Sequence, residues 1–230
     1  MSTDAPPPPT IADQALTRAE LEALAVAGPA VLVGVELDEV DLSGLDLTGW
    51  AFERCQLKRT RFTGCRLEAT RWTACRASFA SFDKAELTEA VFRAGDFNNA
   101  SFRRAGLGSA SFQGCKLTGA DLTEAKTLDV SFEATLLIAA KLPAISFRKQ
   151  TLTQLDFGQA DLKKADFRDA VLQDCSLRDA NLAGARFEGA DLRGADLGGL
   201  RLVDAALFRG ATISRQQAGE LLAELGLKVR

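Results

Sequence analysis

The chain of 230 residues is 47% hydrophobic, contains 31 acidic and 28 basic residues, and has a formal net charge of −3 at pH 7. This balance argues against a strongly basic nucleic-acid binder, and no apolar run reaches the roughly 18 residues that a membrane-spanning helix needs. The chain has no histidine, which excludes His-based acid–base catalysis, Ser-His-Asp triads and the usual zinc sites.

The N-terminal residues 1–16 are predicted to be a disordered leader, because they contain four consecutive prolines, Pro6 to Pro9. A positively charged start followed by an apolar stretch is missing from them. We therefore expect no secretory signal, no membrane association and a cytoplasmic location.

Residues 17–34 are predicted to form a capping helix followed by a first strand. Thr17 and Glu20 have the spacing of a capping box, in which each side chain pairs with the other residue's main-chain N–H. The helix is expected over residues 18–27 and ends at Gly28. It is expected to cover the apolar end of the segment that follows.

Residues 35–212 follow a five-residue period, clearest in the stretch GADLRGADLGG with Leu192 and Leu197 at equivalent places. A step of five rotates an apolar residue by about 140° on a helix and places successive leucines on opposite faces of a strand, so neither straight element explains it. Stepping by five from Leu37 to Leu207 gives 35 positions, of which 20 are Leu, 12 are Phe and one is Trp. The chain must turn a corner about once per unit, as it does in a solenoid.

A second inward position lies two residues before each apolar centre, and it must be small, because 22 of its 35 occupants are Ala or Cys. All five cysteines occupy this position, which favours buried reduced thiols over a metal site or a disulfide framework. The expected cytoplasmic location also disfavours a disulfide. The other three positions of each unit are mostly polar or Gly, and we expect them to face water or form corners.

This pattern, A-[DN]-[LF]-x-x, resembles the pentapeptide repeat family over residues 35–212. The resemblance implies an all-β solenoid, a right-handed quadrilateral parallel β-helix with four units per coil. The 35 units would then make about nine coils, and at the ~4.8 Å spacing of hydrogen-bonded strands the rod would be about 40 Å long. Short capping helices are expected at both ends, and no cofactor is expected.

Three places depart from the pattern. Ala77 and Thr127 replace large apolar centres, and the apolar residues that follow them, Phe79 and Leu128, are predicted either to form a local bulge or to point outward. Between residues 136 and 155 several residues are too large for the small inward position, which predicts a flared coil with an exposed apolar patch. These large residues are Ile145, Gln150 and Leu155.

No catalytic motif is present: the sequence lacks a phosphate-binding GxxxxGK[ST] loop and a GxGxxG loop after a strand. The carboxylates recur at every fifth position, which is typical of solvated wall positions, so we expect a non-enzyme. Residues 36–53 hold six acids and no base, whereas residues 54–76 hold seven bases and one acid. Either kind of charge could meet a partner protein. The candidate contacts are Asp156, Asp161, Asp166, Asp191, Asp196, Arg61, Arg66, Arg71 and Arg76.

Residues 213–230 leave the repeat. Ser214 and Gln217 have capping-box spacing, and Gly226 can end the helix. The stretch ISRQQAGELLAELGLKVR resembles the ending of Qnr-type quinolone-resistance proteins and, more loosely, that of the MfpA type. In those relatives a C-terminal helix and the segment after it join two rods end to end, so the resemblance implies a homodimer; the alternative is a tail that only caps a monomer. The contact would involve Leu221, Leu222, Leu225, Leu227 and Val229.

The same resemblance implies a partner. Qnr-like and MfpA-like proteins act on DNA gyrase and topoisomerase IV, and the usual explanation is that a dimeric acidic rod imitates duplex DNA and protects or inhibits the enzyme. In this chain the repeat has no interrupting loops of the Qnr kind, and acidic and basic segments alternate. A second hypothesis therefore stands beside the first, namely a scaffold that binds another protein through its walls. Neither hypothesis involves direct binding of nucleic acid.

Overall fold

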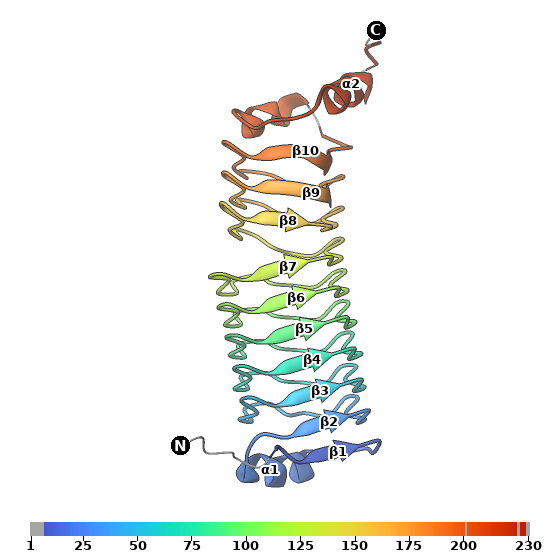
Figure 1. Ribbon diagram of the computed structural model, residues 1–230, viewed down its shortest axis with the longest axis vertical. Coiled ribbons are helices and arrows are strands. Elements are labelled where there is room, and N and C mark those ends of the chain that lie inside the picture. Colours follow the sequence, from blue (N-terminus) through green and yellow to red (C-terminus); the bar gives the residue numbers. More distant parts are fainter. Residues whose placement is uncertain (1–6, 201, 225, 229–230) are drawn as a thin grey trace.

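The computed structural model describes residues 7–200, 202–224 and 226–228. The chain forms an elongated rod with one helix at its N-terminal end and two helical segments at the other (Figure 1). The elements in chain order are β1 Thr10–Ala12, α1 Arg18–Ala27, β2 Val31–Val33, β3 Ala51–Glu53, β4 Arg71–Thr73, β5 Val91–Arg93, β6 Ser111–Gln113, β7 Ser131–Glu133, β8 Thr151–Thr153, β9 Val171–Ser176, β10 Asp191–Asp196, the 3-10 helix η1 Leu202–Phe208 and α2 Arg215–Glu224.

The rod has four walls, and each coil of four units contributes one unit to each wall. The first wall is a parallel sheet whose ten strands follow one another in chain order. The second, third and fourth walls begin with residues 36–40, 41–45 and 46–50, and single parallel bridges join wall segments on successive coils, as Glu36 pairs with Gln56. The predicted parallel β-solenoid of about nine coils, with a short helix at each end, is confirmed.

The interior of the rod contains both inward positions of the repeat. Leu162 and Phe167 represent the apolar centres, and both are completely buried. The five cysteines are also buried and carry free thiols. Aromatic centres on successive coils stack, as Phe92 and Phe112 do with ring centroids 4.5 Å apart and planes 4° from parallel. Burying each Leu or Phe contributes about 1.5–3 kcal/mol before ordering entropy is subtracted.

The corners of the coils require left-handed backbone. Gly114 has φ of +62°, a conformation that glycine adopts without steric cost. Ala94 occupies the equivalent corner one coil earlier with φ of +52°, where its Cβ is disfavoured. Many corners of this chain therefore carry strain that the stacked coils must offset.

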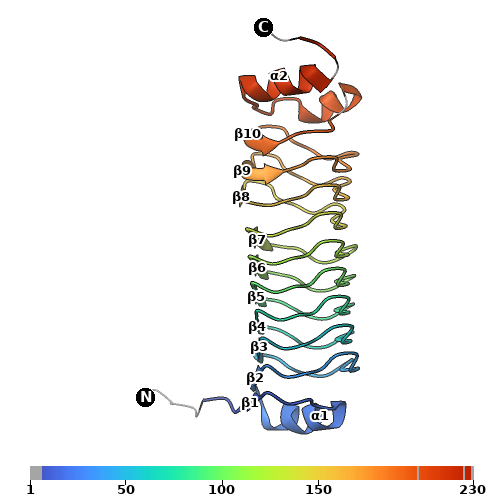
Figure 2. The same cartoon turned by 90° about the vertical axis from the view of Figure 1, so that its right-hand side faces the viewer.

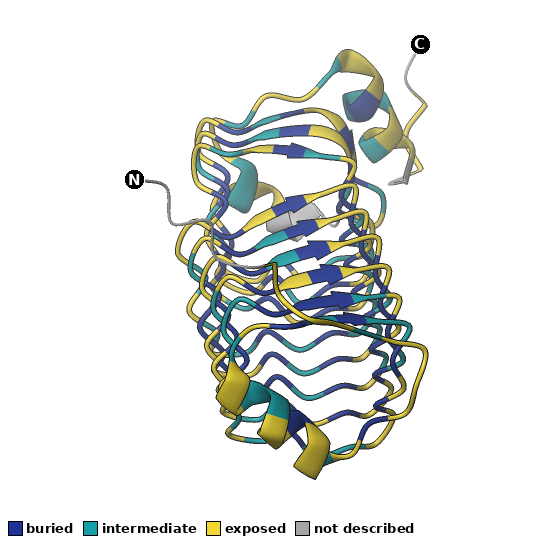
Figure 3. Cartoon of the chain, turned by 60° about the horizontal axis from the view of Figure 1, so that its bottom comes forward, coloured by how far each residue is buried: buried dark blue, intermediate teal, exposed yellow. Residues whose placement is uncertain are grey.

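The N-terminal end of the core is covered by α1, which lies across the first coil (Figure 3). The predicted capping box is present, because Thr17 and Glu20 bond each other's main-chain N–H groups. Leu21 points into the core and is completely buried. Arg18 donates to the carbonyls of Asp41 and Ser43 at 2.9 and 3.1 Å, which ties the helix to the first full coil.

The leader prediction for residues 1–16 is wrong over β1. Residues 10–12 pair with Val31–Val33 of β2 in parallel register, so they extend the first wall by one strand. The reason is that the sheet edge at β2 offers unpaired N–H and C=O groups that a preceding segment can bond whatever its side chains. Residues 1–6 of the predicted leader lie outside the described residues.

The repeat also ends earlier than residue 212. The last two units, around residues 202 and 207, form η1, and Leu207 packs only partly buried against the core. Thr212 still bridges to Asp191, so the final wall contact comes from the segment after η1. A terminal coil has no further coil to bond, so a compact helical turn satisfies its backbone internally.

The two apolar residues after the substituted centres both point outward. Phe79 is 52% exposed, and the Arg59 guanidinium lies over its ring at 5.7 Å from the centroid. Leu128 is 76% exposed. The predicted flared coil is present as well: β7 and β8 pair only at Glu133 and Thr153, and they lie visibly farther apart than their neighbours (Figure 2).

Candidate interaction surfaces

The side chain of Gln217 closes the C-terminal end of the core. Ser214 N–H donates to Gln217 Oε1 at 2.7 Å, and Gln217 N–H donates to Ser214 Oγ at 3.1 Å, which completes the predicted capping box. Gln217 Nε2 also donates to the carbonyls of Leu192 and Ala195, at 2.6 and 2.7 Å. Carbonyls of the last regular coil thus find in α2 the partners that another coil would supply.

The second role of Gln217 was not predicted. Its capping-box position was visible in the sequence, but the contact with Leu192 depends on how α2 lies across the last coil. An amide side chain directly after the end of a repeat is the signal that could have indicated it, because an amide carries two donors and an acceptor.

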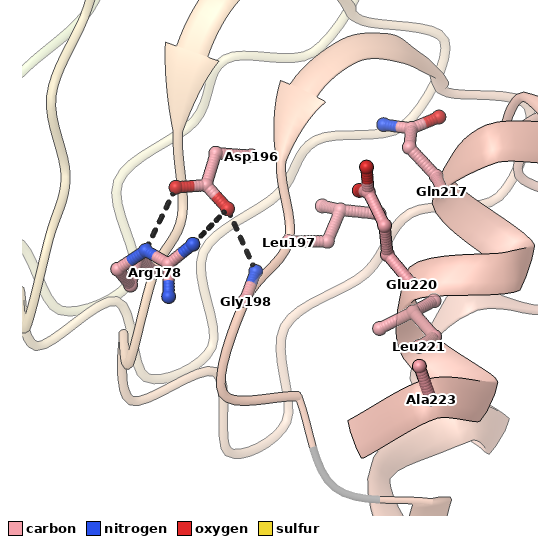
Figure 4. A pocket seen from close by; sticks show the side chains of 8 residues that line it. All are labelled: Arg178, Asp196, Leu197, Gly198, Gln217, Glu220, Leu221 and Ala223. Carbon is pink, nitrogen blue, oxygen red and sulfur yellow. Dashed lines mark hydrogen bonds and ion pairs between the residues drawn. The ribbon is translucent and has the colours of Figure 1, made fainter. Parts of the chain in front are cut away.

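A hollow of about 400 Å³ lies between α2 and the last coil (Figure 4). Arg178 reaches Asp196 there through two hydrogen bonds of 2.8 and 3.0 Å, and Gly198 N–H donates to the same carboxylate at 2.9 Å. Glu220 and Leu221 line the opposite side from α2. The lining residues include no hydroxyl, thiol or amine side chain, so the hollow lacks those nucleophiles.

The residues predicted to form a dimer contact divide into three groups. Leu221 packs against the core and belongs to the cap. Leu222 and Leu227 are 37% and 56% exposed, and Leu227 lies in an open groove beside Gly219 and Ala223 on the outer side of α2. Leu225 and Val229 lie outside the described residues.

The five candidate aspartates do not lie on one surface. Successive units face successive walls, so Asp156, Asp161 and Asp166 lie on the second, third and fourth walls. Asp191 lies on the first wall. Asp196 lies on the second wall, directly above Ser176 of the preceding coil. Four of them form ion pairs with a neighbouring basic side chain. These pairs are Asp161–Lys163 at 3.6 Å, Asp166–Arg168 at 2.5 Å, Asp191–Arg193 at 2.5 Å and Asp196–Arg178 at 2.8 Å.

The pKa values of two of these carboxyl groups reflect the pairing. Two hydrogen bonds from Arg193, the larger effect coming from its side chain and the smaller from its main chain, lower the pKa of Asp191 to about 2. The Arg168 side chain lowers the pKa of Asp166 below its ordinary value. Both carboxylates are therefore charged at neutral pH, and each already has a cationic neighbour.

The basic band at residues 54–76 stacks directly on the acidic coil before it. Arg61 pairs with Asp41 at 2.7 Å, and Arg66 pairs with Asp46 at 2.9 Å, each pair joining equivalent positions of two successive coils. For Arg71 and Arg76 no ion pair is present within the described part of the chain. The four arginines occupy four different walls, so they form a ring of positive charge around the rod.

The first wall carries fewer charges than the others. Its outward positions between residues 91 and 174, all within the described part, hold three charged side chains, Arg93, Glu133 and Asp174. A shallow hollow of about 310 Å³ lies on this wall over β6, β7 and β8. The fourth wall over the same coils holds nine charged side chains. They are Lys126, Asp129, Arg148, Lys149, Asp166, Arg168, Asp169, Arg186 and Glu188.

Within residues 7–200 and the described C-terminal segments, no group of three or more Cys, Asp or Glu side chains could hold a metal ion. No helix in the described ranges has the length and apolar character needed to cross a membrane.

Comparisons with known proteins agree with this architecture. The family model "Pentapeptide repeat region" matches residues 45–122, and the model "Pentapeptide repeats (8 copies)" matches residues 131–169 and 170–207. No curated protein matches the chain.

Two solved structures are similar along most of their length. One is full-length QnrB1, a plasmid-mediated fluoroquinolone resistance protein, with a TM-score of 0.72 and 21% identity over 95% of this chain and 100% of that one. The other is HetL, a pentapeptide repeat protein involved in heterocyst differentiation regulation from the cyanobacterium Nostoc sp. strain PCC 7120, with a TM-score of 0.64 and 24% identity over 81% of this chain and 86% of that one.

Proposed function

Because the chain belongs to the pentapeptide repeat family, we propose that it is a non-enzymatic rod that binds DNA gyrase or topoisomerase IV as a homodimer, modulating the enzyme or protecting it from quinolones. The observation that carries this proposal is the C-terminal end, where α2 closes the core through Gln217 and still presents Leu222 and Leu227 outward. Similarity to QnrB1 over 95% of this chain and 100% of that one supports the choice of partner.

The proposed dimer joins two rods at their C-terminal ends. Leu222 and Leu227 supply apolar area, and the small residues Gly219 and Ala223 leave room for a side chain of the second copy. Pairing through one self-complementary patch gives two-fold symmetry, which is the commonest oligomer geometry. In this proposal Leu225 and Val229 belong to the same contact.

The size of such a dimer suits a substitute for DNA. About nine coils at ~4.8 Å give a rod of about 40 Å, and two rods end to end give about 80 Å, the length of about 24 base pairs. Asp156, Asp161 and Asp166 face three directions, as phosphates do around a duplex. A partner that surrounds the rod would meet them together, whereas a flat partner would not.

The distribution of charge then assigns each end of the rod a role. The candidate aspartates lie near the proposed dimer seam, and the ring formed by Arg61, Arg66, Arg71 and Arg76 lies near the distal ends. We propose that the central acidic part lies on the positively charged DNA path of the topoisomerase. The basic ring would contact an acidic protein surface beyond that path.

The experiment that tests this proposal is a DNA gyrase supercoiling assay with the purified protein, with and without a quinolone. We expect the protein to reduce supercoiling or to restore it in the presence of the drug. No change in either condition over a wide concentration range would reject the topoisomerase proposal.

The sparsely charged first wall favours a second candidate function, a scaffold for a different protein partner. Depletion of charge is the compositional sign of the central part of protein interfaces. In this case Ser111→Lys on the first wall should abolish partner binding, and Ser146→Lys at the same unit position on the fourth wall should not. The same pair of variants in the gyrase assay also reports which wall a topoisomerase would use.

A further inference from the structure

The coils are joined by a regular ladder of main-chain hydrogen bonds, and between residues 51 and 181, all of them described, this ladder is interrupted at one place. In the coil before the interruption, Arg104, Leu107 and Ser109 donate to carbonyls of the following coil, at 3.1, 2.8 and 2.9 Å. The equivalent donors one coil later, Glu124, Thr127 and Asp129, make no such bonds to the described residues above them.

The opposite side of the same gap is also unbonded. Ser131 donates to Ala110 at 3.0 Å and Lys126 donates to Ala105 at 2.9 Å, but the equivalent bonds from Thr151 and Ser146 are missing among these described residues. Five consecutive ladder bonds are therefore absent between residues 124–130 and 143–151. We call this unbonded stretch of the fourth wall and its two corners the open joint.

Side-chain volume explains why the open joint forms. The small inward position of this wall holds Ala110 and Ala170 on the coils below and above, but Val130 and Gln150 on the two coils between them. Close packing leaves no room for both at the normal coil spacing. At the neighbouring corner Ile145 stacks on Ala125 in the same way.

The central position makes the open joint weaker still. Thr127 replaces the large apolar residue that fills this place on other coils, and it is only half-buried. Less apolar area is therefore buried across the open joint than between regular coils. Leu128 beside it points into solvent and adds nothing to the contact.

The remaining walls hold the two halves of the rod together. On the second wall Leu117 N–H donates to Leu136 O at 2.8 Å, so the ladder there is continuous. On the first wall the single bridge Glu133–Thr153 remains. The bonded second wall lies opposite the unbonded fourth wall. The two coils are therefore held together on one side of the rod and unbonded on the other.

We propose that the open joint is a hinge at which the rod bends, with the fourth wall opening and closing and the second wall acting as the pivot. Opening of the fourth wall requires no ladder bond of that wall to break, because those bonds are already absent. Two stiff stacks, one ending near residue 130 and the other beginning near residue 143, move as units, because Lys126 is bonded to the coil below and Phe147 to the coil above. This inference is independent of the identity of the partner.

Distance measurements between pairs of spin labels test the hinge directly. Gly108 and Glu188 lie on the fourth wall four coils apart and span the open joint. Thr48 and Leu128 occupy equivalent positions four coils apart but both lie on its N-terminal side, where Ser109 N–H donates to Leu128 O at 2.9 Å. Labels are attached to cysteines at these sites after the five native cysteines are replaced by alanine, the commonest residue at their position. Gly108 tolerates the change, because an added Cβ would meet nothing closer than 3.8 Å.

We expect a distance distribution at least twice as broad for the Gly108/Glu188 pair as for the Thr48/Leu128 pair. Equal widths would overturn the hinge. Amide hydrogen exchange on the unlabelled wild-type protein gives a second result: Thr127, Asp129 and Ser146 should exchange about 100-fold faster than Leu107, Ser109 and Lys126. Comparable rates would overturn the claim that the joint is open.

A variant designed to close the joint gives the converse test. Thr127→Leu combined with Val130→Ala and Gln150→Ala restores the residue types of the regular coils. We expect its amides at the joint to exchange as slowly as those of the neighbouring coil and its Gly108/Glu188 distribution to narrow to the control width. A folded variant that keeps both the fast exchange and the broad distribution would show that packing at these positions does not cause the motion.

Discussion

Gln217 Nε2 lies 2.6 Å from the carbonyl oxygen of Leu192, so one side chain of α2 replaces a main-chain donor that a further coil would provide. Replacing Gln217 by Leu keeps the approximate volume and removes this donor. We expect the free energy of unfolding of the last coil and α2 to fall by about 1–3 kcal/mol, because two buried carbonyls lose their partner. Hydrogen exchange of the last coil measures the effect.

A control for this change is available one residue away. Gln216 is exposed and bonds Glu220 on the helix surface at 2.8 Å. Gln216→Leu should alter the same free energy by less than about 0.5 kcal/mol. Similar losses in both variants would contradict the closing role of Gln217.

The left-handed corners allow a pair of opposite substitutions. Ala94→Gly should raise the free energy of unfolding by about 0.5–1 kcal/mol, because relief of the disfavoured φ exceeds the entropy that glycine adds to the unfolded chain. Gly114→Ala, one coil later, should lower it by a similar amount. Thermal or denaturant unfolding of the two variants measures both changes in the free energy of unfolding. Changes of the same sign would contradict the claim that the backbone at Ala94 is strained.

The cysteines should be protected in the folded protein. Burial raises the pKa of Cys65 to about 11, so its thiolate is scarce at pH 8, and no reagent can reach the sulfur without local unfolding. We expect all five cysteines to resist a bulky thiol reagent in the native state and to react in denaturant. Rapid native labelling of Cys115 or Cys175 would show that the small position is open there.

The proposed dimer contact predicts a change of oligomeric state. Leu222→Asp should convert a dimer to a folded monomer, since the carboxylate would be buried against its symmetry copy. Val26→Asp is the matched control, because Val26 is 90% exposed on the other capping helix and lies far from α2. Light scattering distinguishes the outcomes: a monomeric wild type rejects the dimer. A monomeric variant with full activity on gyrase rejects DNA mimicry.

Acid should weaken the region around Asp191. Its pKa in the folded protein, about 2, lies below the ordinary value of 3.8, so its contribution to stability is complete above pH 4 and disappears as the pH falls through 2. We expect the difference in melting temperature between the wild type and Asp191→Asn to shrink between pH 4 and pH 2. A constant difference would mean that the ion pair with Arg193 does not stabilise the coil.

Much of the fold could be predicted because the repeat is set by local requirements. Each unit needs one large apolar centre and one small inward residue, and the short spacing of Thr17 and Glu20 marks the helix start. By contrast, β1 pairs through backbone groups, which leave no trace in side-chain pattern. The aspartates recur at every fifth position, but their directions follow from the four-unit coil, which the resemblance supplied and the residues alone did not.

The ion pairs between successive coils have a consequence for how the chain can change in length. Inserting a single unit preserves the inward register of every later unit, so the core survives. It also rotates every later outward residue by one wall, which would separate Arg61 from Asp41 and Arg66 from Asp46 if the unit entered between them. Insertion of a whole coil of four units keeps every later residue on its own wall, so it separates only those ion pairs whose two members flank the inserted coil. The interior of the rod thus tolerates growth by single units, whereas its surface tolerates growth only by complete coils.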